Sequence, residues 1–216
     1  MSGAPALALR VAETQPRCTV LGPGVRFGVW VQGCGIGCAG CISPQWIPAE
    51  GGSWLPVAEL AERIVHEAVD GLTLSGGEPF DQAGAAADLV RRVRARRDMS
   101  VLSYTGYTLS HLRRHGTPDQ HALLDALDLL VDGPYLRAKH ADLRWRASTN
   151  QRVHHLTGRH APLDATDDRS AGLQFDIAGD GTVHFTGVPP VPDFRERLEA
   201  SLALTRAAPP AEEPTP

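Results

Sequence analysis

Hydrophobic residues recur along the chain in two alternating patterns, short apolar runs and stripes at helical spacing. The runs Val25–Val31, Gly71–Leu74, Val101–Tyr104 and Leu127–Val131 each end two residues before a glycine, which predicts four strands. Short buried strands separated by helices are typical of βαβ units in a parallel sheet. The pattern therefore predicts an α/β fold.

The segments between these strands carry the helical spacing. Pro56 is a favoured first residue of a helix, and Asp81 is a candidate N-cap for the next helix. Two shorter helices are expected around Leu109–Arg114 and His121–Ala126. The buried stripes of the two longer helices are Val57, Leu60, Ala61, Ile64, Val65 and Ala68, then Ala86, Leu89, Val90 and Val93.

The last third of the chain follows a different pattern. Leu173–Ile177 and Thr182–Thr186 flank a Gly-rich turn and predict an antiparallel β-hairpin. Phe194–Leu204 is expected to close the fold as a helix, and a further strand is expected near Val153. The Pro-, Ala- and Glu-rich residues 207–216 are expected to be disordered.

Composition narrows the class of protein. A chain of 216 residues with 42% hydrophobic and 21% charged residues is typical of one soluble globular domain, and its net charge of −4 gives no reason to expect a nucleic-acid partner. Phe27–Pro48 is uncharged, but five glycines and two prolines interrupt it, so it is not expected to span a membrane. Met1–Leu9 lacks the pattern of a secretory signal. We expect a cytoplasmic protein without a membrane partner.

Three of the four cysteines lie close together, as Cys34-x3-Cys38-x2-Cys41. Such crowding is poor for disulfides and good for gripping a metal. Glycines between the sulfurs let the backbone wrap tightly around an electron-rich cluster. Because a 4Fe-4S cubane needs four ligands, three cysteines would leave one iron open to a substrate or cofactor.

A structural zinc site is the alternative, with a histidine as fourth ligand. The sequence has no second CxxC pair, and no histidine follows Cys41 within a short loop, so the spacing favours the cluster. Cys18 is expected to be an ordinary buried or half-buried cysteine. With four cysteines in all, a second cluster held by cysteine alone cannot form.

A second motif, Ser75-Gly76-Gly77-Glu78-Pro79, follows the second predicted strand. Ligand sites of α/β sheets and barrels lie at the carboxyl ends of strands. The glycines allow close approach of the backbone, and Glu78 offers an anionic acceptor for an ammonium group. Alone the motif could be a simple turn, but one strand after the cysteine loop it indicates a ligand site.

Together these motifs resemble the radical S-adenosylmethionine superfamily, and most closely the small glycyl-radical activating enzymes such as the anaerobic ribonucleotide reductase activating proteins. The resemblance runs from about residue 8 to 158. The matching segments are Gly22–Phe27, Trp30–Cys34, Cys38–Cys41, Leu74–Pro79, Tyr104–Gly106, Asp128–Tyr135 and Ser148–Arg152.

The resemblance implies a partial (β/α) barrel, open at one side, to which this chain adds the C-terminal β-hairpin and helix predicted above. It implies a single radical S-adenosylmethionine domain over residues 1–206, with a core of about 8–158 and an extension over 159–206. Residue 40, before the third cysteine, is glycine as in the ribonucleotide reductase activators, whereas Ile42 stands where those proteins usually have an aromatic residue.

The resemblance also implies the cofactors, a 4Fe-4S cluster held by Cys34, Cys38 and Cys41 and S-adenosyl-L-methionine on the open iron. Reductive cleavage would give methionine and a 5′-deoxyadenosyl radical. Carried over by position, Gly77 and Glu78 would contact the amino group of S-adenosylmethionine. The cofactor-binding residues expected in all are Gly40, Cys41, Ile42, Gly76, Gly77, Glu78, Pro79 and Asp132, with Gly40–Ile42 near the adenine.

The implied activity is abstraction of a glycine hydrogen in a glycyl-radical partner protein, with the electron supplied by flavodoxin or ferredoxin. Two alternatives stay open. A radical enzyme with the same cofactors could act on a small molecule or peptide, or the chain could be a noncatalytic zinc- or cluster-binding protein.

Overall fold

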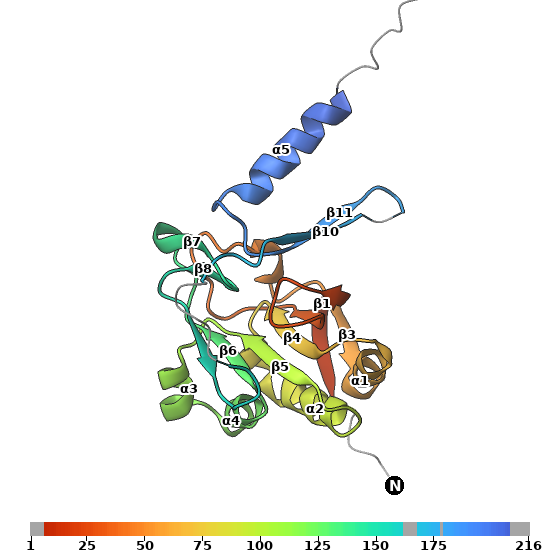
Figure 1. Ribbon diagram of the computed structural model, residues 1–216, viewed down its shortest axis with the longest axis vertical. Helices are drawn as coiled ribbons and strands as arrows, with labels where there is room; N and C mark the ends of the chain where they lie inside the picture. Colours follow the sequence, from red (N-terminus) through yellow and green to blue (C-terminus); the bar gives the residue numbers. More distant parts are fainter. Residues whose placement is uncertain (1–6, 162–167, 178, 208–216) are drawn as a thin grey trace, which may run out of the picture.

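The computed structural model describes residues 7–161, 168–177 and 179–207, and its main feature is a seven-stranded sheet with helices packed against it (Figure 1). The strand order is β3-β1-β2-β4-β5-β6-β9. These strands are β1 (Ala8–Cys18), β2 (Arg26–Val31), β3 (Ser53–Pro56), β4 (Gly71–Gly76), β5 (Ser100–Tyr104), β6 (Leu129–Asp132) and β9 (Arg152–His155).

Two small antiparallel pairs and the helices complete the described fold. The pairs are β7 (His140–Leu143) with β8 (Arg146–Ser148), and β10 (Leu173–Ile177) with β11 (Val183–Gly187). The helices are α1 (Val57–His66), α2 (Ala83–Arg94), α3 (Leu109–His115), α4 (Pro118–Asp125) and α5 (Phe194–Ala207), with 3-10 turns η1 (Pro44–Trp46), η2 (Pro79–Gln82) and η3 (Arg137–Lys139).

The centre of the sheet is parallel. β2, β4, β5 and β6 pair in parallel in that order, while β1, β3 and β9 pair antiparallel with their neighbours. The four strands predicted from apolar runs are these parallel strands, so the α/β class is confirmed. The sheet has two end strands, β3 and β9, and its closure toward a barrel stays a prediction. The arrangement brings the carboxyl ends of four strands to one edge.

The two faces of the sheet are covered differently. Helices α1, α2, α3 and α4 pack on one face, where the main apolar core joins them to alternate residues of the parallel strands (Figure 1). The predicted stripes of α1 and α2 form part of this core, because Leu60, Ile64, Leu89 and Val93 are buried there. The other face presents larger aromatic side chains, including Trp30, and it is the face beside the candidate site.

A buried cation joins three of the parallel strands. Arg26 is fully buried, and its guanidinium donates to Thr73 Oγ1 at 2.6 Å, to Leu72 O at 2.6 Å and to Ser100 O at 3.1 Å. Loss of hydration lowers the pKa of Arg26 to about 10, so it stays charged at neutral pH. These hydrogen bonds fix the starts of β2, β4 and β5 relative to one another.

The N-terminal strands β1 and β3 were not predicted. The sequence of β1 contains Pro16 and a polar stretch, which hides its apolar alternation, and the strand has irregular register between Gln15 and Cys18. Cys18 at its end is fully buried, as expected for an ordinary core cysteine.

The expected capping role of Asp81 is wrong. The η2 turn separates the Gly-Glu motif from α2, and the N-cap residue of α2 is Gln82, without a side-chain cap hydrogen bond. Instead, Glu78 caps η2 by accepting a hydrogen bond from Phe80 N. The Asp81 carboxylate turns toward the cysteine loop, because Gly35 N donates to it at 2.7 Å.

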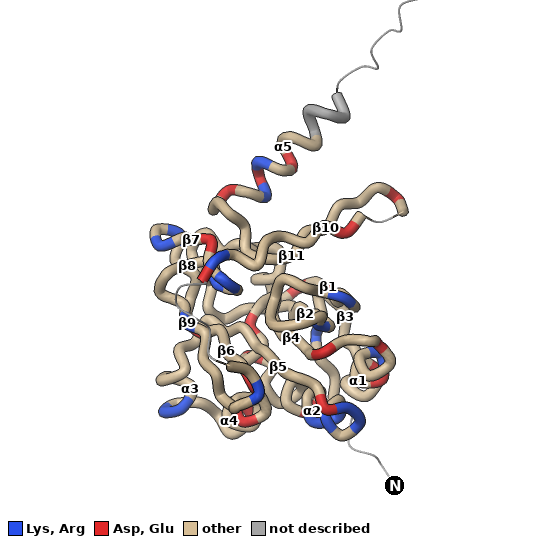
Figure 2. Tube along the Cα trace, in the orientation of Figure 1, with Lys and Arg blue, Asp and Glu red and all other residues tan. Residues whose placement is uncertain are grey.

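The hairpin β10–β11 and the helix α5 confirm the elements expected at the C-terminal end. Figure 1 shows α5 projecting away from the sheet, and Figure 2 shows acidic and basic residues along it and over the outer helices. The expected disordered tail, apart from Ala207 at the end of α5, lies outside the described residues. None of the described helices combines the length and apolarity needed to cross a bilayer.

Candidate active site

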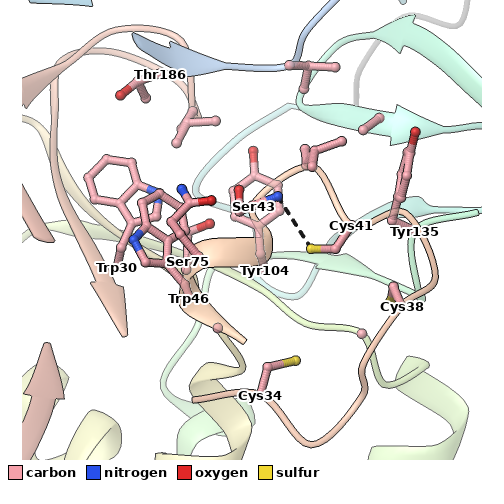
Figure 3. Close-up of a pocket in the computed structure, with 18 of the residues that line it drawn as sticks. Trp30, Cys34, Cys38, Cys41, Ser43, Trp46, Ser75, Tyr104, Tyr135 and Thr186 are labelled. Atoms are coloured by element: carbon pink, nitrogen blue, oxygen red, sulfur yellow. Dashed lines mark hydrogen bonds between the residues drawn. The ribbon is translucent and has the colours of Figure 1, made fainter. Parts of the chain in front are cut away.

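A cavity of about 390 Å³ opens at the carboxyl ends of the parallel strands. Residues that follow β2, β4, β5 and β6 line it, and β11 of the hairpin lines it from the other side. Figure 3 shows Trp30 and Trp46 on one side of this space, Cys38 and Cys41 on the other, and Cys34 below the centre. The cavity therefore joins a thiol-rich part to an aromatic part.

The cysteine loop lines the cavity with all three of its thiols, those of Cys34, Cys38 and Cys41. Its backbone is anchored where it begins, since Cys34 N donates to Ile47 O at 3.1 Å. It turns at Gly37 and Gly40, whose φ angles of 60° and 73° are strained for other residues. The loop thus folds back on itself around a common space.

Hydrogen bonding and burial both affect the thiols. Ser43 N donates to the sulfur of Cys41 at 3.4 Å, and all four cysteines of the chain are free. Burial raises the pKa of the Cys38 and Cys41 thiols above the usual value, because a thiolate loses hydration there. A bound cation is the natural compensation for thiolates in such a place.

The donor set fits an iron–sulfur cluster. Over residues 7–161, 168–177 and 179–207, no three His, Cys, Asp or Glu side chains gather closely enough to share one metal ion. In a cubane each thiolate binds a different iron atom, so the sulfurs surround the cluster and do not converge on one point. Three thiols arranged around one cavity match that requirement.

The Gly-Glu turn touches the cysteine loop through backbone atoms. Glu78 N donates to Gly33 O at 2.9 Å, and Gly77 N donates to Val31 O at 2.7 Å. A Cβ on Gly77 would lie 2.1 Å from Gly33 O, so residue 77 must be glycine for this approach. Gly76, Gly77 and Glu78 all line the cavity beside the thiols.

Glu78 is almost completely buried, with 1% of its surface exposed. Phe80 N and Thr105 Oγ1 each donate to its Oε1 at 2.9 Å, and Gly106 N donates to its Oε2 at 2.7 Å. Burial raises the pKa of Glu78 to about 7, although these three donors favour the charged form. The carboxylate thus braces the ends of β4 and β5 and borders the cavity.

Other expected cofactor residues are placed less directly. Ile42 lines the cavity and packs near Tyr135, whereas Gly40 and Pro79 are not among the lining residues. Asp132 does not line it either: its carboxylate accepts from Leu109 N at 2.6 Å and lies 3.0 Å from His154 Nε2. The structure thus gives Asp132 a bracing position, and its contact with a cofactor stays a prediction.

Several site features were not foreseen. Asp81 accepts from Gly35 N and, at 2.9 Å, from the hydroxyl of Tyr107, so it braces the cysteine loop. Tyr104 lines the same cavity, and its buried hydroxyl has no hydrogen-bond partner among the described residues. The position of Asp81 just after the Gly-Glu motif was the only available signal, because the other contacts depend on tertiary packing.

Known proteins resemble this chain over the region that builds the site. The model of the "4Fe-4S single cluster domain" family matches residues 20–154. An anaerobic ribonucleoside-triphosphate reductase-activating protein of Vibrio cholerae is 36% identical over 154 residues, which cover 66% of this chain and 95% of the relative. The protein of that name from Escherichia coli (strain K12) is 34% identical over 150 residues, covering 63% and 92%.

A second group of relatives is more distant. A pyruvate formate-lyase-activating enzyme of Clostridium pasteurianum is 27% identical over 139 residues, covering 62% of this chain and 53% of the relative. The matched residues 20–154 contain the cysteine loop and the Gly-Glu turn and exclude the hairpin β10–β11 and α5.

Proposed function

Because this chain belongs to the radical S-adenosylmethionine family of glycyl-radical activating enzymes, we propose that it cleaves S-adenosylmethionine reductively and abstracts a hydrogen atom from a glycine of a partner protein. The proposed partner is a glycyl-radical protein, and the proposed electron donor is a reduced flavodoxin or ferredoxin in the cytoplasm. The relatives named as activating proteins support this proposal.

Cys34, Cys38 and Cys41 would each bind one iron of a 4Fe-4S cluster, which leaves the fourth iron without a protein ligand. When bound, the cluster supplies the single electron that splits S-adenosylmethionine into methionine and a 5′-deoxyadenosyl radical. Abstraction of the Cα hydrogen of the partner's glycine would give 5′-deoxyadenosine and a glycyl radical. One electron enters and one radical remains, so the electrons balance.

The Gly-Glu turn would hold the amino group of S-adenosylmethionine. The buried carboxylate of Glu78 would offer an anionic acceptor, and Gly77 lets the turn pack against the backbone of Gly33, which keeps Glu78 beside the thiols. Ile42 lines the cavity where contact with the adenine is proposed, and the backbone of Gly40 would lie nearby. Pro79, which is buried at the start of η2, would fix the direction of the chain after the turn.

The observation that carries the proposal is the hydrogen bond from Glu78 N to Gly33 O. It joins the backbone of the residue before the first cysteine to the backbone of Glu78, and both motifs border one cavity. We include in the proposal that residues 1–206 form one domain, in which the parallel strands are part of an incomplete (β/α) barrel around this cavity.

Anaerobic reconstitution tests the proposal. Purified protein with iron, sulfide, dithionite and S-adenosylmethionine should release 5′-deoxyadenosine, and Cys38→Ser protein should not. Addition of a candidate glycyl-radical protein should then give a glycyl radical signal in electron paramagnetic resonance. Release of 5′-deoxyadenosine without that signal for any candidate protein would favour a small-molecule or peptide substrate. Absence of release would support a noncatalytic metal protein.

A further inference from the structure

The cavity is bordered by one strand of the hairpin and not by the other. All five residues of β11, Val183–Gly187, line it, and no residue of β10 does. Successive side chains of a strand point to opposite faces, so a cavity beside one face of the hairpin would touch alternate residues of both strands. The cavity therefore lies along the outer edge of β11.

That edge carries backbone groups without partners among the described residues. β11 pairs with β10 over five residue pairs, from Leu173 with Gly187 to Ile177 with Val183. In an antiparallel pair, alternate residues point their N–H and C=O groups away from the partner strand. No other described strand pairs with β11, so these groups are open to an added strand on the side of β11 away from β10.

Side chains of the hairpin hold it against β1 and the loop that follows β1. Gln174 accepts from Thr19 N at 3.0 Å and donates to Arg17 O at 2.8 Å. On the other strand, His184 lies 3.6 Å from the carboxylate of Glu13. Figure 3 shows Thr186 of β11 above the aromatic side of the cavity. These contacts hold the free edge in a fixed direction.

A cationic side chain stands beside this edge. Arg195, at the start of α5, lines the cavity and places its guanidinium carbon 4.8 Å from the centre of the Phe185 ring. Its Nη1 lies 3.7 Å from a carboxylate oxygen of Glu199 in a solvent-exposed pair, which binds it weakly. The guanidinium can therefore also donate to a peptide carbonyl or carboxylate.

We propose that the glycine-bearing segment of the partner protein binds as an extended strand along the free edge of β11, with Arg195 holding one of its carbonyl or carboxylate groups. This inference rests on the proposed function. A folded domain cannot enter this cavity, whereas an extended segment can lie along the strand edge that borders it and satisfy the open backbone groups. The thiols border the same cavity, so a glycine in this segment reaches the site of radical formation.

The extension is the part of the chain suited to choosing a partner. The matched family region ends at residue 154, before β10, β11 and α5. The cofactor motifs are thus complete without the hairpin, whereas the cavity wall is not. The cofactor motifs and the proposed peptide-binding edge of β11 therefore lie in different parts of the chain.

Peptide binding tests the strand geometry directly. The probe is a synthetic nonapeptide centred on the glycine of the glycyl-radical protein that the enzyme activates, bound to the reconstituted enzyme with S-adenosylmethionine. N-methylation at every second residue should weaken binding about tenfold, and methylation at the residues between should have little effect. Equal effects at all positions, or no binding of the parent peptide, would overturn the proposal.

Variants of Arg195 and Phe185 give an independent test, in which the intact partner protein replaces the peptide. Arg195→Gln and Phe185→Ala should raise the ratio of 5′-deoxyadenosine released to glycyl radical formed about tenfold, because the substrate is misplaced while the cofactor motifs remain. Arg195→Gln leaves the contact of Phe185 with Phe194 in place, so it separates a lost donor from a loosened hairpin. Ile177→Ser, on exposed β10 and away from the cavity, is the matched control.

The outcomes distinguish this inference from the proposed function. A wild-type enzyme that releases no 5′-deoxyadenosine contradicts the proposed function itself. Normal release with an unchanged ratio in the Arg195 and Phe185 variants contradicts only the role of the hairpin. If light scattering shows dimers that the partner peptide cannot dissociate, and Arg195→Gln protein is a monomer, the edge of β11 pairs with a second copy of the chain and the proposal is wrong.

Discussion

The Gly-Glu turn and the hairpin β10–β11 border one cavity but are held in opposite ways. The turn is fixed by short backbone hydrogen bonds to β2 and its following loop, and Glu78 within it is buried. The hairpin is fixed to β1 and its following loop by side-chain contacts at exposed positions, such as that of Gln174 with Thr19. The difference indicates that the turn has one permitted geometry. The hairpin, in contrast, can differ in sequence between proteins that catalyse the same type of reaction.

The largest effect is expected from Gly77→Ala. A Cβ at this position would meet Gly33 O at 2.1 Å and Trp46 O at 2.9 Å, both backbone atoms, so the turn must move away from the cysteine loop. Affinity for S-adenosylmethionine, measured by calorimetry on the reconstituted protein, should fall about a hundredfold or more. Gly158→Ala is the control, because a Cβ there meets nothing within 4 Å. Unchanged affinity in the Gly77 variant would show that the turn is not part of the binding site.

The next largest effect is expected at Glu78, whose protonation should make the affinity for S-adenosylmethionine depend on pH. Its pKa of about 7 means that the carboxylate gains a proton as the pH falls through neutrality and then no longer attracts an ammonium group. Affinity should fall about tenfold between pH 8 and pH 6 in the wild type. Glu78→Gln should bind more weakly, without this dependence, and should keep its iron. A Gln variant with wild-type affinity in calorimetry would contradict the assigned role.

Asp81→Asn should have a moderate effect on the cysteine loop. The carboxylate receives hydrogen bonds from Gly35 N and from the Tyr107 hydroxyl, and an amide can accept only one of them in the same geometry. We expect a loss of about 1–2 kcal/mol of stability and faster removal of iron by a chelator. Tyr107→Phe, which removes one donor and keeps the contact to Gly35, should lie between the variant and the wild type. Equal iron loss in all three proteins would exclude a bracing role for Asp81.

Glu13→Gln should have the smallest effect. Glu13 and His184 are half-exposed and lie 3.6 Å apart, so solvent screens their attraction. The thermal midpoint should fall by no more than the few degrees that correspond to about 0.5 kcal/mol, and release of 5′-deoxyadenosine should stay unchanged. A large loss of stability would show that the hairpin is held more tightly than its contacts indicate.

Much of the central fold could be predicted because its strands are continuous apolar runs. β2, β4, β5 and β6 are buried on both faces, and such strands are apparent from composition alone. β1 could not be found in the same way, since Pro16 and neighbouring polar residues interrupt its pattern. β3 pairs only with residues 8–11 of β1, so Pro16 has a partner strand on one side alone, where proline is tolerated.

The parts of the candidate site that consist of short sequence motifs could be predicted. The parts that depend on tertiary packing could not. The cysteine spacing and the Gly-Glu motif identified two elements that meet in space, because both follow parallel strands. The roles of Asp81 and of β11 depend on which loops face each other across the cavity, and no local pattern records that. Asp132 is the opposite case, because its place at a strand end predicted a cofactor contact. In the structure its carboxylate accepts a hydrogen bond from Leu109 N and lies beside the His154 ring.

The central claim is that Cys34, Cys38 and Cys41 hold a cubane cluster with one iron free to bind S-adenosylmethionine beside Glu78. Mössbauer spectroscopy of anaerobically reconstituted protein measures this most directly. We expect about four irons per chain, three of them alike, and a fourth whose signal shifts when S-adenosylmethionine is added. A single bound zinc, or four equivalent irons that S-adenosylmethionine does not affect, would contradict it.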